Sequence, residues 1–169
     1  WNSSTQTNTD CRYLAQHLFM PIMEPGTFQE FKDWLNHAYE ISGKSNLYIA
    51  YIVDTDQADG GATVRVHPNK APLWPATKEH ELNAKTSRRQ EMVTLPPATN
   101  LREKSLESRH QKVLEIARSK KINQVLHPQE STIGFLSAGL AYLCLEHALH
   151  EMGLTDKFPI LKFGITYPI

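Results

Sequence analysis

The residues best suited to bind a ligand lie in a polar stretch near the start of the sequence. The stretch offers short hydroxyl and amide groups and one cation, namely Ser4, Gln6, Asn8 and Arg12. Such groups fit a carboxylate or a carbonyl, because hydroxyls and amides hydrogen-bond without adding charge and arginine can donate two parallel N–H groups. The same stretch is equally consistent with a capped surface turn, in which Arg12 pairs internally with Asp10 or Glu24.

Two other stretches resemble a metal site and a phosphate-binding loop, but each lacks part of the pattern that such a site requires. Residues 146–151 place carboxylates and imidazoles three and four positions apart, which is a spacing that can bind a metal. However, His-Glu-x-x-His is absent and no third ligand can be located, so exposed pairs such as Glu146–His150 explain the pattern. Residues 59–63 contain two adjacent glycines, but a strand pattern follows them instead of the helix that a phosphate loop requires. We therefore predict neither a catalytic residue nor a metal site.

The spacing of apolar residues indicates the elements that position these groups. Helices are predicted over residues 11–18, 27–42 and 139–152, and strands over residues 20–23, 47–53, 132–136 and 160–163. Asp10 is expected to cap the first helix. Thr27 and Glu30 form a capping-box pattern at the start of the second helix, and Gly43 is expected to end it. Strand, helix and strand alternate twice, which predicts an α/β fold of βαβ units with parallel sheets.

Burial and ligand contacts can also be predicted along these elements. Phe31 and Trp34 should be buried on one face of their helix, and Cys144 should lie on the apolar face of the last helix. Residues 137–139 follow a predicted strand. Because α/β sheets bind ligands at the carboxyl ends of their strands, these residues are candidate ligand contacts.

The composition changes in the middle of the sequence and indicates a domain boundary. Residues 62–67 are predicted to form an edge strand, and prolines and polar residues make residues 68–92 an extended linker. One long amphipathic helix is predicted over residues 99–126. We therefore divide the chain into residues 1–67, the linker, and residues 93–169.

Composition and charge argue against several classes of protein. The 169 residues carry no formal net charge, which disfavours a nucleic-acid partner. No apolar run reaches the ~20 residues that a membrane span needs. Cys11 and Cys144 are far apart, which excludes a disulfide framework and a self-contained iron–sulfur or zinc site and fits a reduced, cytoplasmic protein. The sequence begins at Trp1 and stops within a predicted loop, so we expect a piece of a larger protein.

Motifs spread over nearly the whole sequence are shared with one family. Near the start they are Ser3-Ser-Thr-Gln-Thr-Asn-Thr-Asp-Cys-Arg-Tyr13, Met20-Pro-Ile-Met-Glu-Pro25, Gln29-Glu30 and Ala38-Tyr-Glu-Ile-Ser42. Near the end they are Leu95-Pro-Pro97, Ile133-Gly134, Ser137-Ala-Gly-Leu-Ala-Tyr142 and Leu161-Lys-Phe-Gly-Ile-Thr-Tyr-Pro168. Together they resemble the α subunit of the indolepyruvate ferredoxin oxidoreductases, within the 2-oxoacid:ferredoxin oxidoreductase superfamily. Residues 54–92 match this family poorly.

The resemblance implies an enzyme that oxidatively decarboxylates arylpyruvates to acyl-CoA with thiamine diphosphate and Mg²⁺. Electrons would pass through 4Fe–4S clusters to ferredoxin, in an oligomer with a second subunit or a fused domain. Residues 1–67 would be the C-terminal part of a pyrimidine-binding domain, and residues 93–169 the start of a transketolase-C-terminal-like domain. The cofactor-activating glutamate would precede Trp1, and the diphosphate site and the cluster cysteines would follow Ile169.

Within that family, the polar stretch that contains Ser4, Gln6, Asn8 and Arg12 would border the channel of the 2-oxoacid. One departure from the family is informative. Many members carry Thr-Thr-Arg-x-x-His after the second strand, where this sequence has Val53-Asp-Thr-Asp-Gln57. The identity of the 2-oxoacid and the retention of the standard reaction are therefore left open.

Two rival interpretations stay open at the level of sequence. One is a non-catalytic α/β domain that serves assembly within a larger complex, which the long charged helix and the lack of a complete active site favour. The other is a stand-alone nucleotide-binding domain of flavodoxin-like type. An upstream thiamine domain and downstream cysteine motifs in the full reading frame would favour the enzyme.

The first prediction concerns the 169-residue chain by itself. Because the activating glutamate and the Mg²⁺–diphosphate ligands are expected elsewhere, the chain should show no thiamine-diphosphate turnover and only weak binding of the cofactor. Calorimetric titration with thiamine diphosphate and Mg²⁺ measures this, and micromolar binding by the chain alone would contradict the domain placement.

Overall fold

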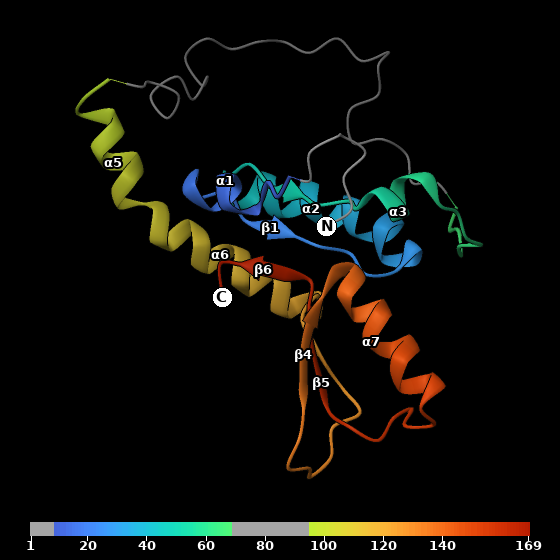
Figure 1. The fold of residues 1–169 in the computed structure, drawn as a ribbon. Coiled ribbons are helices and arrows are strands. Elements are labelled where there is room, and N and C mark those ends of the chain that lie inside the picture. The colour runs from blue at the N-terminus through green and yellow to red at the C-terminus, as the bar shows by residue number, and fades with distance from the viewer. Residues whose placement is uncertain (1–8, 69–94) are drawn as a thin grey trace. The chain divides into compact units, whose positions relative to one another are not determined.

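The computed structural model describes residues 9–68 and 95–169 (Figure 1). The chain divides into two compact units. The first unit comprises Trp1–Val64 and Ser108–Ile169, and the second comprises Arg65–Glu107. The described part of the second unit contains the short helix α5 (Ala98–Lys104) and the first two residues of α6 (Leu106–Ser119). Everything below on sheets, core and pocket concerns the first unit.

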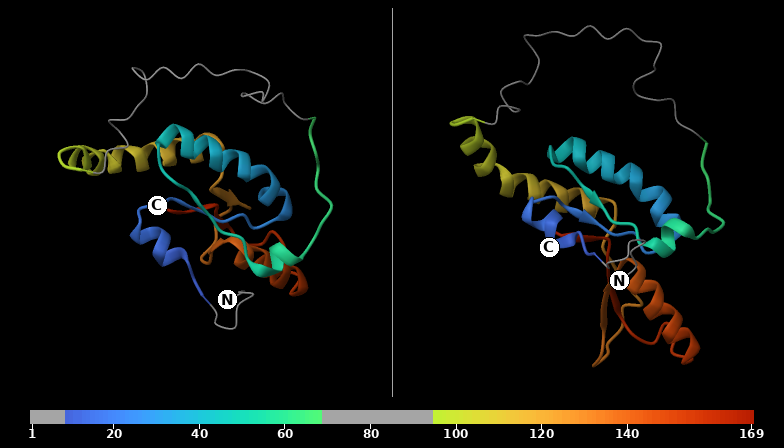
Figure 2. Two further views of the ribbon diagram at one scale, coloured as in Figure 1. Left: turned by 90° about the horizontal axis from the view of Figure 1, so that it is seen from above. Right: turned by 45° about the horizontal axis from the view of Figure 1, so that its top comes forward.

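Sheet A brings together strands from both ends of the first unit. Its order is β2-β1-β6, in which β1 (Ile22–Met23) pairs parallel with β2 (Ala50–Tyr51) and antiparallel with β6 (Ile165–Tyr167). Helices α2 (Phe28–Ser45) and α6 (Leu106–Ser119) lie on one side of these strands, and α1 (Arg12–His17) lies across the strands from α2 (Figure 2). Because both faces are covered, Ile22 and Met23 are buried.

Sheet B is formed entirely by the last third of the chain. Its order is β3-β5-β4, in which β5 (Ile160–Phe163) pairs antiparallel with β3 (Gln124–Leu126) and parallel with β4 (Phe135–Ala138). Helix α7 (Gly139–Glu151) follows β4 directly and packs on one face of the sheet through Tyr142 and Leu149. The rings of Phe135 and Phe158 meet edge to face beside this helix, with centroids 5.5 Å apart.

The main hydrophobic core lies between sheet A and the helices α2 and α6. It is built from Met23, Trp34, Ala38, Ile41, Val113, Ile116, Ala117, Ile122 and Ile165. Each helix contributes residues spaced three or four apart, so one apolar stripe of each faces the sheet. Among the described helices, none is long and apolar enough to cross a membrane.

The predicted fold class is confirmed, as are several local expectations. The structure is mixed α/β, and β1–α2–β2 and β4–α7–β5 each join two parallel strands through a helix. The capping box at the start of α2 is present, because the Thr27 hydroxyl accepts a hydrogen bond from the Glu30 N–H and the Glu30 carboxylate accepts one from the Thr27 N–H. Trp34 is buried as predicted, with 7% of its surface exposed.

The parallel pairing of the four predicted strands is confirmed, but each sheet also contains an antiparallel strand that the sequence does not predict. Each sheet therefore has one parallel and one antiparallel pair of strands. The antiparallel pairs are β6 with β1 and β3 with β5. The strands are also shorter than predicted, and only β5 has the predicted bounds, Ile160–Phe163. Residues 62–67 do not form the expected edge strand: they have no regular structure, and 73% of the surface of Val66 is exposed.

The prediction of one long helix over residues 99–126 is also wrong. It is interrupted after α5, and α6 ends at Ser119. The reason lies in the core, because Ile122 is fully buried and the backbone turns sharply before it, with φ 53° at Lys121. Val125 belongs to β3, where it pairs with Leu161 instead of extending the helix.

Three details of the helix ends and faces differ from the expectations. Helix α2 continues past Gly43 and ends at Ser45. The C-cap residue is Asn46, and asparagine tolerates the left-handed backbone conformation that it adopts there. Phe31 is only half-buried, although its ring contacts Tyr51 with centroids 6.0 Å apart. Cys11, not Asp10, occupies the N-cap position of α1 and makes no side-chain cap hydrogen bond, while the Asp10 carboxylate accepts a hydrogen bond from the Arg12 N–H.

The second prediction tests the core face of α2. Trp34→Ala should lower the free energy of unfolding by about 3–5 kcal/mol, because the truncation leaves a cavity between α2 and sheet A. Tyr39→Ala is the matched control on the same helix, since 74% of Tyr39 is exposed, and it should change stability by no more than about 0.5 kcal/mol. Chemical denaturation of both variants measures this, and equal midpoints would show that the core face is misassigned.

Candidate functional site

A pocket of about 420 Å³ lies where the carboxyl ends of two strands lead into helices. β2 leads to α3 (Thr55–Asp59) and β4 leads to α7, and the residues before α1 close the third side. The lining residues are Thr9, Asp10, Arg12, Asp54, Asp56, Ala138, Leu140, Ala141 and Cys144. This position matches the general rule that α/β proteins bind ligands at the carboxyl edge of their sheets.

Among the described residues that line the pocket, Arg12 is the only cation, and two carboxylates bind its guanidinium. Nε and Nη2 donate to Glu24 Oε2 at 2.9 and 2.7 Å, and Nη1 donates to Asp10 Oδ1 at 3.2 Å. The internal pairing anticipated for Arg12 is therefore present with both candidate partners. Within the described residues, these bonds use three of the five N–H groups of the guanidinium.

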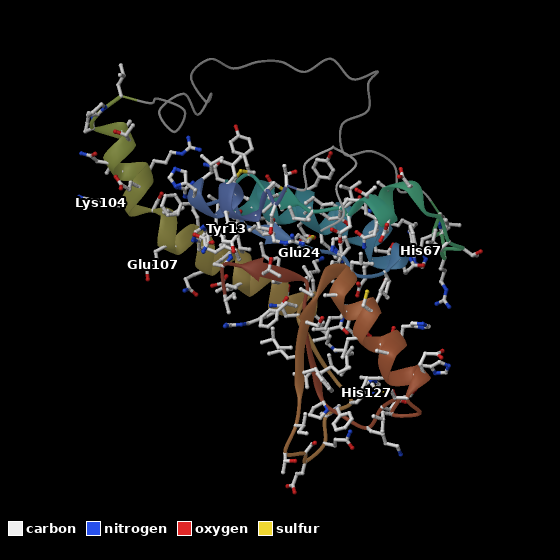
Figure 3. The ribbon with its side chains drawn as sticks, viewed as in Figure 1. Tyr13, Glu24, His67, Lys104, Glu107 and His127 are labelled. Atoms are coloured by element: carbon white, nitrogen blue, oxygen red, sulfur yellow. The ribbon has the colours of Figure 1, made fainter. Side chains whose placement is uncertain are left out.

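Glu24 connects Arg12 to the rest of the first unit. Its side chain is nearly buried, and its second carboxylate oxygen, Oε1, accepts a hydrogen bond from the Thr166 hydroxyl on β6. Its backbone N–H donates to the Gly164 carbonyl at 2.8 Å. Figure 3 labels Glu24 near the middle of the side chains of this unit. Thr166 orients the carboxylate and the backbone bond fixes the residue that carries it, so the guanidinium that Glu24 binds is held in place.

The segments beside the pocket are in close contact. Gly139 has a positive φ of 51°, and a Cβ on Gly26 would lie only 2.9 Å from the Gly139 carbonyl oxygen. The side-chain amide of Gln57 on α3 donates to the Pro25 carbonyl at 2.8 Å. The turn after β1, the start of α7 and α3 are thereby held against one another.

A second ion pair, in which the lysine is buried, lies beside the turn that joins β1 to α2. Lys162 Nζ on β5 binds Glu30 Oε1 on α2, and only 4% of Lys162 is exposed. The ammonium also lies 4.0 Å from the centroid of the Tyr142 ring on α7, which is a cation–π contact. The other carboxylate oxygen of Glu30 accepts the backbone N–H groups of Gly26 and Thr27. Lys162 therefore joins β5, α2 and α7.

The pKa values of Arg12, Asp10 and Tyr142 are shifted by burial and by their hydrogen-bond partners. The hydrogen bonds to Glu24 raise the pKa of Arg12 above its usual range, so the guanidinium stays charged. The backbone N–H of Arg12, followed by the Arg12 charge, holds the pKa of Asp10 below its ordinary value. Burial, followed by the hydrogen bond to Glu146, raises the pKa of the Tyr142 phenol.

The structure brings only some of the predicted site residues to this pocket. Arg12 lines it, and so does Ala138 from the predicted contact segment at the end of β4. Ser4, Gln6 and Asn8 lie outside the described residues, so their role in substrate binding stays a prediction.

Several residues at the site were not anticipated. Asp54 and Asp56 line the pocket although the sequence around them reads only as a polar turn. The sequence indicates Glu24 only as a possible partner of Arg12. The signal for a fixed backbone around Glu24 is the pair of prolines, Pro21 and Pro25, that flank residues 22–24. Cys144, expected in the buried face of α7, is exposed and lines the pocket, because that face of the helix starts at the carboxyl edge of β4.

The helix-spaced carboxylates and imidazoles of α7 do not form the exposed pairs that we expected. Glu146 accepts the Tyr142 hydroxyl at 2.7 Å, and His150 contacts the Thr155 hydroxyl at 3.4 Å. Within residues 9–68 and 95–169, no three His, Cys, Asp or Glu side chains are grouped to hold a metal ion.

Curated proteins named indolepyruvate oxidoreductase subunit IorA are similar to this chain over almost its whole length. The protein of Methanothermobacter marburgensis is 26% identical over 166 residues, which are 98% of this chain and 25% of that protein. The protein of Pyrococcus abyssi is 25% identical over 166 residues, with the same coverage. The protein of Methanothermobacter thermautotrophicus is 25% identical over 168 residues. No family model and no solved structure matches the chain.

These relatives confirm the resemblance that the motifs indicated. The similarity extends across the linker and both predicted domains, instead of being limited to one motif. The chain spans about a quarter of the length of the curated relatives that it matches.

The third prediction concerns the two carboxylates that hold Arg12. Glu24→Gln should lower the free energy of unfolding by about 1.5–3 kcal/mol, because it removes the charge from a nearly buried pair of hydrogen bonds. Asp10→Asn affects the solvent-exposed side of the same guanidinium and should cost less than about 1 kcal/mol. Urea denaturation of both variants at pH 7 measures the difference. Equal losses would mean that Glu24 does not anchor the site.

Proposed function

We propose that this chain is part of a subunit of a 2-oxoacid oxidoreductase that acts on an arylpyruvate such as indolepyruvate. The observation that carries the proposal is the similarity over 98% of the chain to proteins named indolepyruvate oxidoreductase subunit IorA. The reaction proposed for the full-length protein is oxidative decarboxylation to acyl-CoA. Ferredoxin would be the electron acceptor, and thiamine diphosphate, Mg²⁺ and 4Fe–4S clusters the cofactors.

The described residues of this chain do not themselves fit those cofactors. They contain no group of metal ligands, and the sequence has two cysteines where a cluster is held by four. In our proposal, the cofactors are therefore bound by other parts of the full-length protein or of its partner subunit. The contribution of this chain is to bind and orient the substrate.

The role that we assign to Arg12 is to bind the carboxylate of the 2-oxoacid. Two guanidinium N–H groups, one on each terminal nitrogen, are not used by Glu24 or Asp10. The side chain is 39% exposed and lines the pocket, so these groups are accessible to a ligand. A carboxylate that accepts both would be held in one orientation.

Glu24 supports this role by positioning the guanidinium. Without an opposing carboxylate, the long arginine side chain would sample many rotamers, and part of the binding energy would be lost in ordering it. Because Glu24 is tied to β6 through Thr166, the position of Arg12 depends on the sheet instead of on the loop before α1. We include Ser4, Gln6 and Asn8 as further substrate contacts, as the sequence predicts.

The fourth prediction tests this role by kinetics of the full-length protein. Arg12→Ala and Gln6→Ala should each lower kcat/KM for the 2-oxoacid by at least about tenfold, which corresponds to ~1.4 kcal/mol of transition-state stabilisation. Arg118→Ala is the control, because Arg118 is exposed on α6 and does not line the pocket.

Two outcomes would separate the parts of this proposal. Unchanged kinetics of stably folded Arg12 and Gln6 variants would contradict the substrate contacts alone. Absence of 2-oxoacid oxidation by the parent protein together with its partner subunit, supplied with CoA, thiamine diphosphate, Mg²⁺ and ferredoxin, would contradict the proposed activity itself.

A further inference from the structure

One face of sheet B is apolar and is not covered by any described helix. The cross-strand row Val125–Leu161–Leu136 lies on this face, and Phe163 follows Leu161 two residues along β5. Val125 and Leu136 are 60% and 70% exposed. Leu161 and Phe163, on the central strand, are half-buried between their neighbours. We call these four residues the open face.

The opposite face of the same sheet is built differently. Leu126, Ile160 and Phe135 form the matching cross-strand row there, and α7 packs on it. Figure 1 shows α7 along one side of β4 and β5, without a described helix on the other side. An antiparallel pair such as β3–β5 can leave one face in water, but that face is then normally polar. Here the exposed row is apolar in all three strands, which is the composition of a buried surface.

The dimensions of the open face select the kind of element that can cover it. Three strands spaced ~4.8 Å apart place the outer strands about 10 Å from each other, and four residues span about 13 Å along a strand. This footprint equals the width of one α-helix, about 10 Å, over two to three turns. It is far smaller than the ~800 Å² per partner that a stable dimer buries, which disfavours a second copy of this chain.

The apolar side chains of the open face determine which kind of helix could cover it. Its four side chains are all apolar, so the helix must present an apolar stripe with a period of 3.6 residues and keep its polar residues outside. The relatives are about four times as long as the segment that this chain matches, since that segment is 25% of their length. A longer polypeptide of that kind has ample chain to supply such a helix.

We infer that the open face of sheet B is the docking surface for one amphipathic α-helix of the same polypeptide, from outside the quarter that this chain matches. The inference rests on the proposed function only in placing the chain within a longer subunit. It requires no activity and no cofactor.

The fifth prediction tests the inference by chemical labelling of the full-length protein. Leu136→Cys should react with a maleimide at least about 100-fold more slowly than Leu101→Cys, because local opening must precede labelling of a covered site. Leu101 on α5 is the matched control, with 68% exposure against 70% for Leu136. Mass spectrometry of the labelled peptides separates these positions from native cysteines.

The labelling results distinguish the sources of the cover. Protection that is independent of protein concentration supports a helix of the same polypeptide. Equal labelling rates, protection only at high protein concentration, or protection only after a second subunit is added would each overturn the inference.

A photo-crosslinking residue at position 136 identifies the covering segment. Cross-links should fall on residues three or four apart within one segment of the same chain. Cross-links on alternate residues would indicate a strand and contradict a helix. The labelling readout is independent of 2-oxoacid oxidation, so failure of this inference and failure of the proposed function can be told apart.

Discussion

The arrangement of the first unit depends on the absence of a side chain at Gly164. This residue separates β5 in sheet B from β6 in sheet A, so one short segment contributes a strand to each sheet. A Cβ at this position would lie 2.5 Å from both Ile122 Cγ2 and Trp34 Cη2, a distance that non-bonded carbon atoms do not reach. The core therefore packs directly against the backbone. Asn123 completes the junction, since its side-chain oxygen accepts the N–H groups of Gly164 and Ile165.

Two charge networks, each with one buried charged residue (Glu24 or Lys162), lie on either side of this junction. Two residues before Gly164, Lys162 binds Glu30 on α2. Two residues after it, Thr166 binds Glu24, which holds Arg12 at the pocket. Moving the segment by one residue would turn these side chains to the opposite face of their strands. The geometry at Gly164 thus determines where the guanidinium of Arg12 lies, although the two residues are far apart in the sequence.

Buried ion pairs are costly, which gives their placement a meaning beyond stability. Removing a charged group from water costs several kcal/mol, and the pairing offsets that cost only when geometry and hydrogen bonding are good. Glu30 meets this condition with one lysine and two backbone N–H groups, and Glu24 with arginine and threonine. We interpret both networks as devices that fix the relative positions of strands, helices and pocket. A site that must orient a small carboxylate benefits from such rigidity.

Local patterns in the sequence predict the elements whose structure depends on neighbouring residues. The capping box at Thr27, the buried stripe of α2 that carries Trp34, and the two parallel βαβ units all follow from periodicity and side-chain chemistry. The motifs also indicate the family resemblance, and they identify Arg12 with Glu24 as its potential partner. The antiparallel partners of β1 and β5, the end of α6 before Ile122 and the exposure of Cys144 depend on residues that meet only after folding. Periodicity carries no information about such long-range pairing, because the core and the junction at Gly164 decide which segments become neighbours.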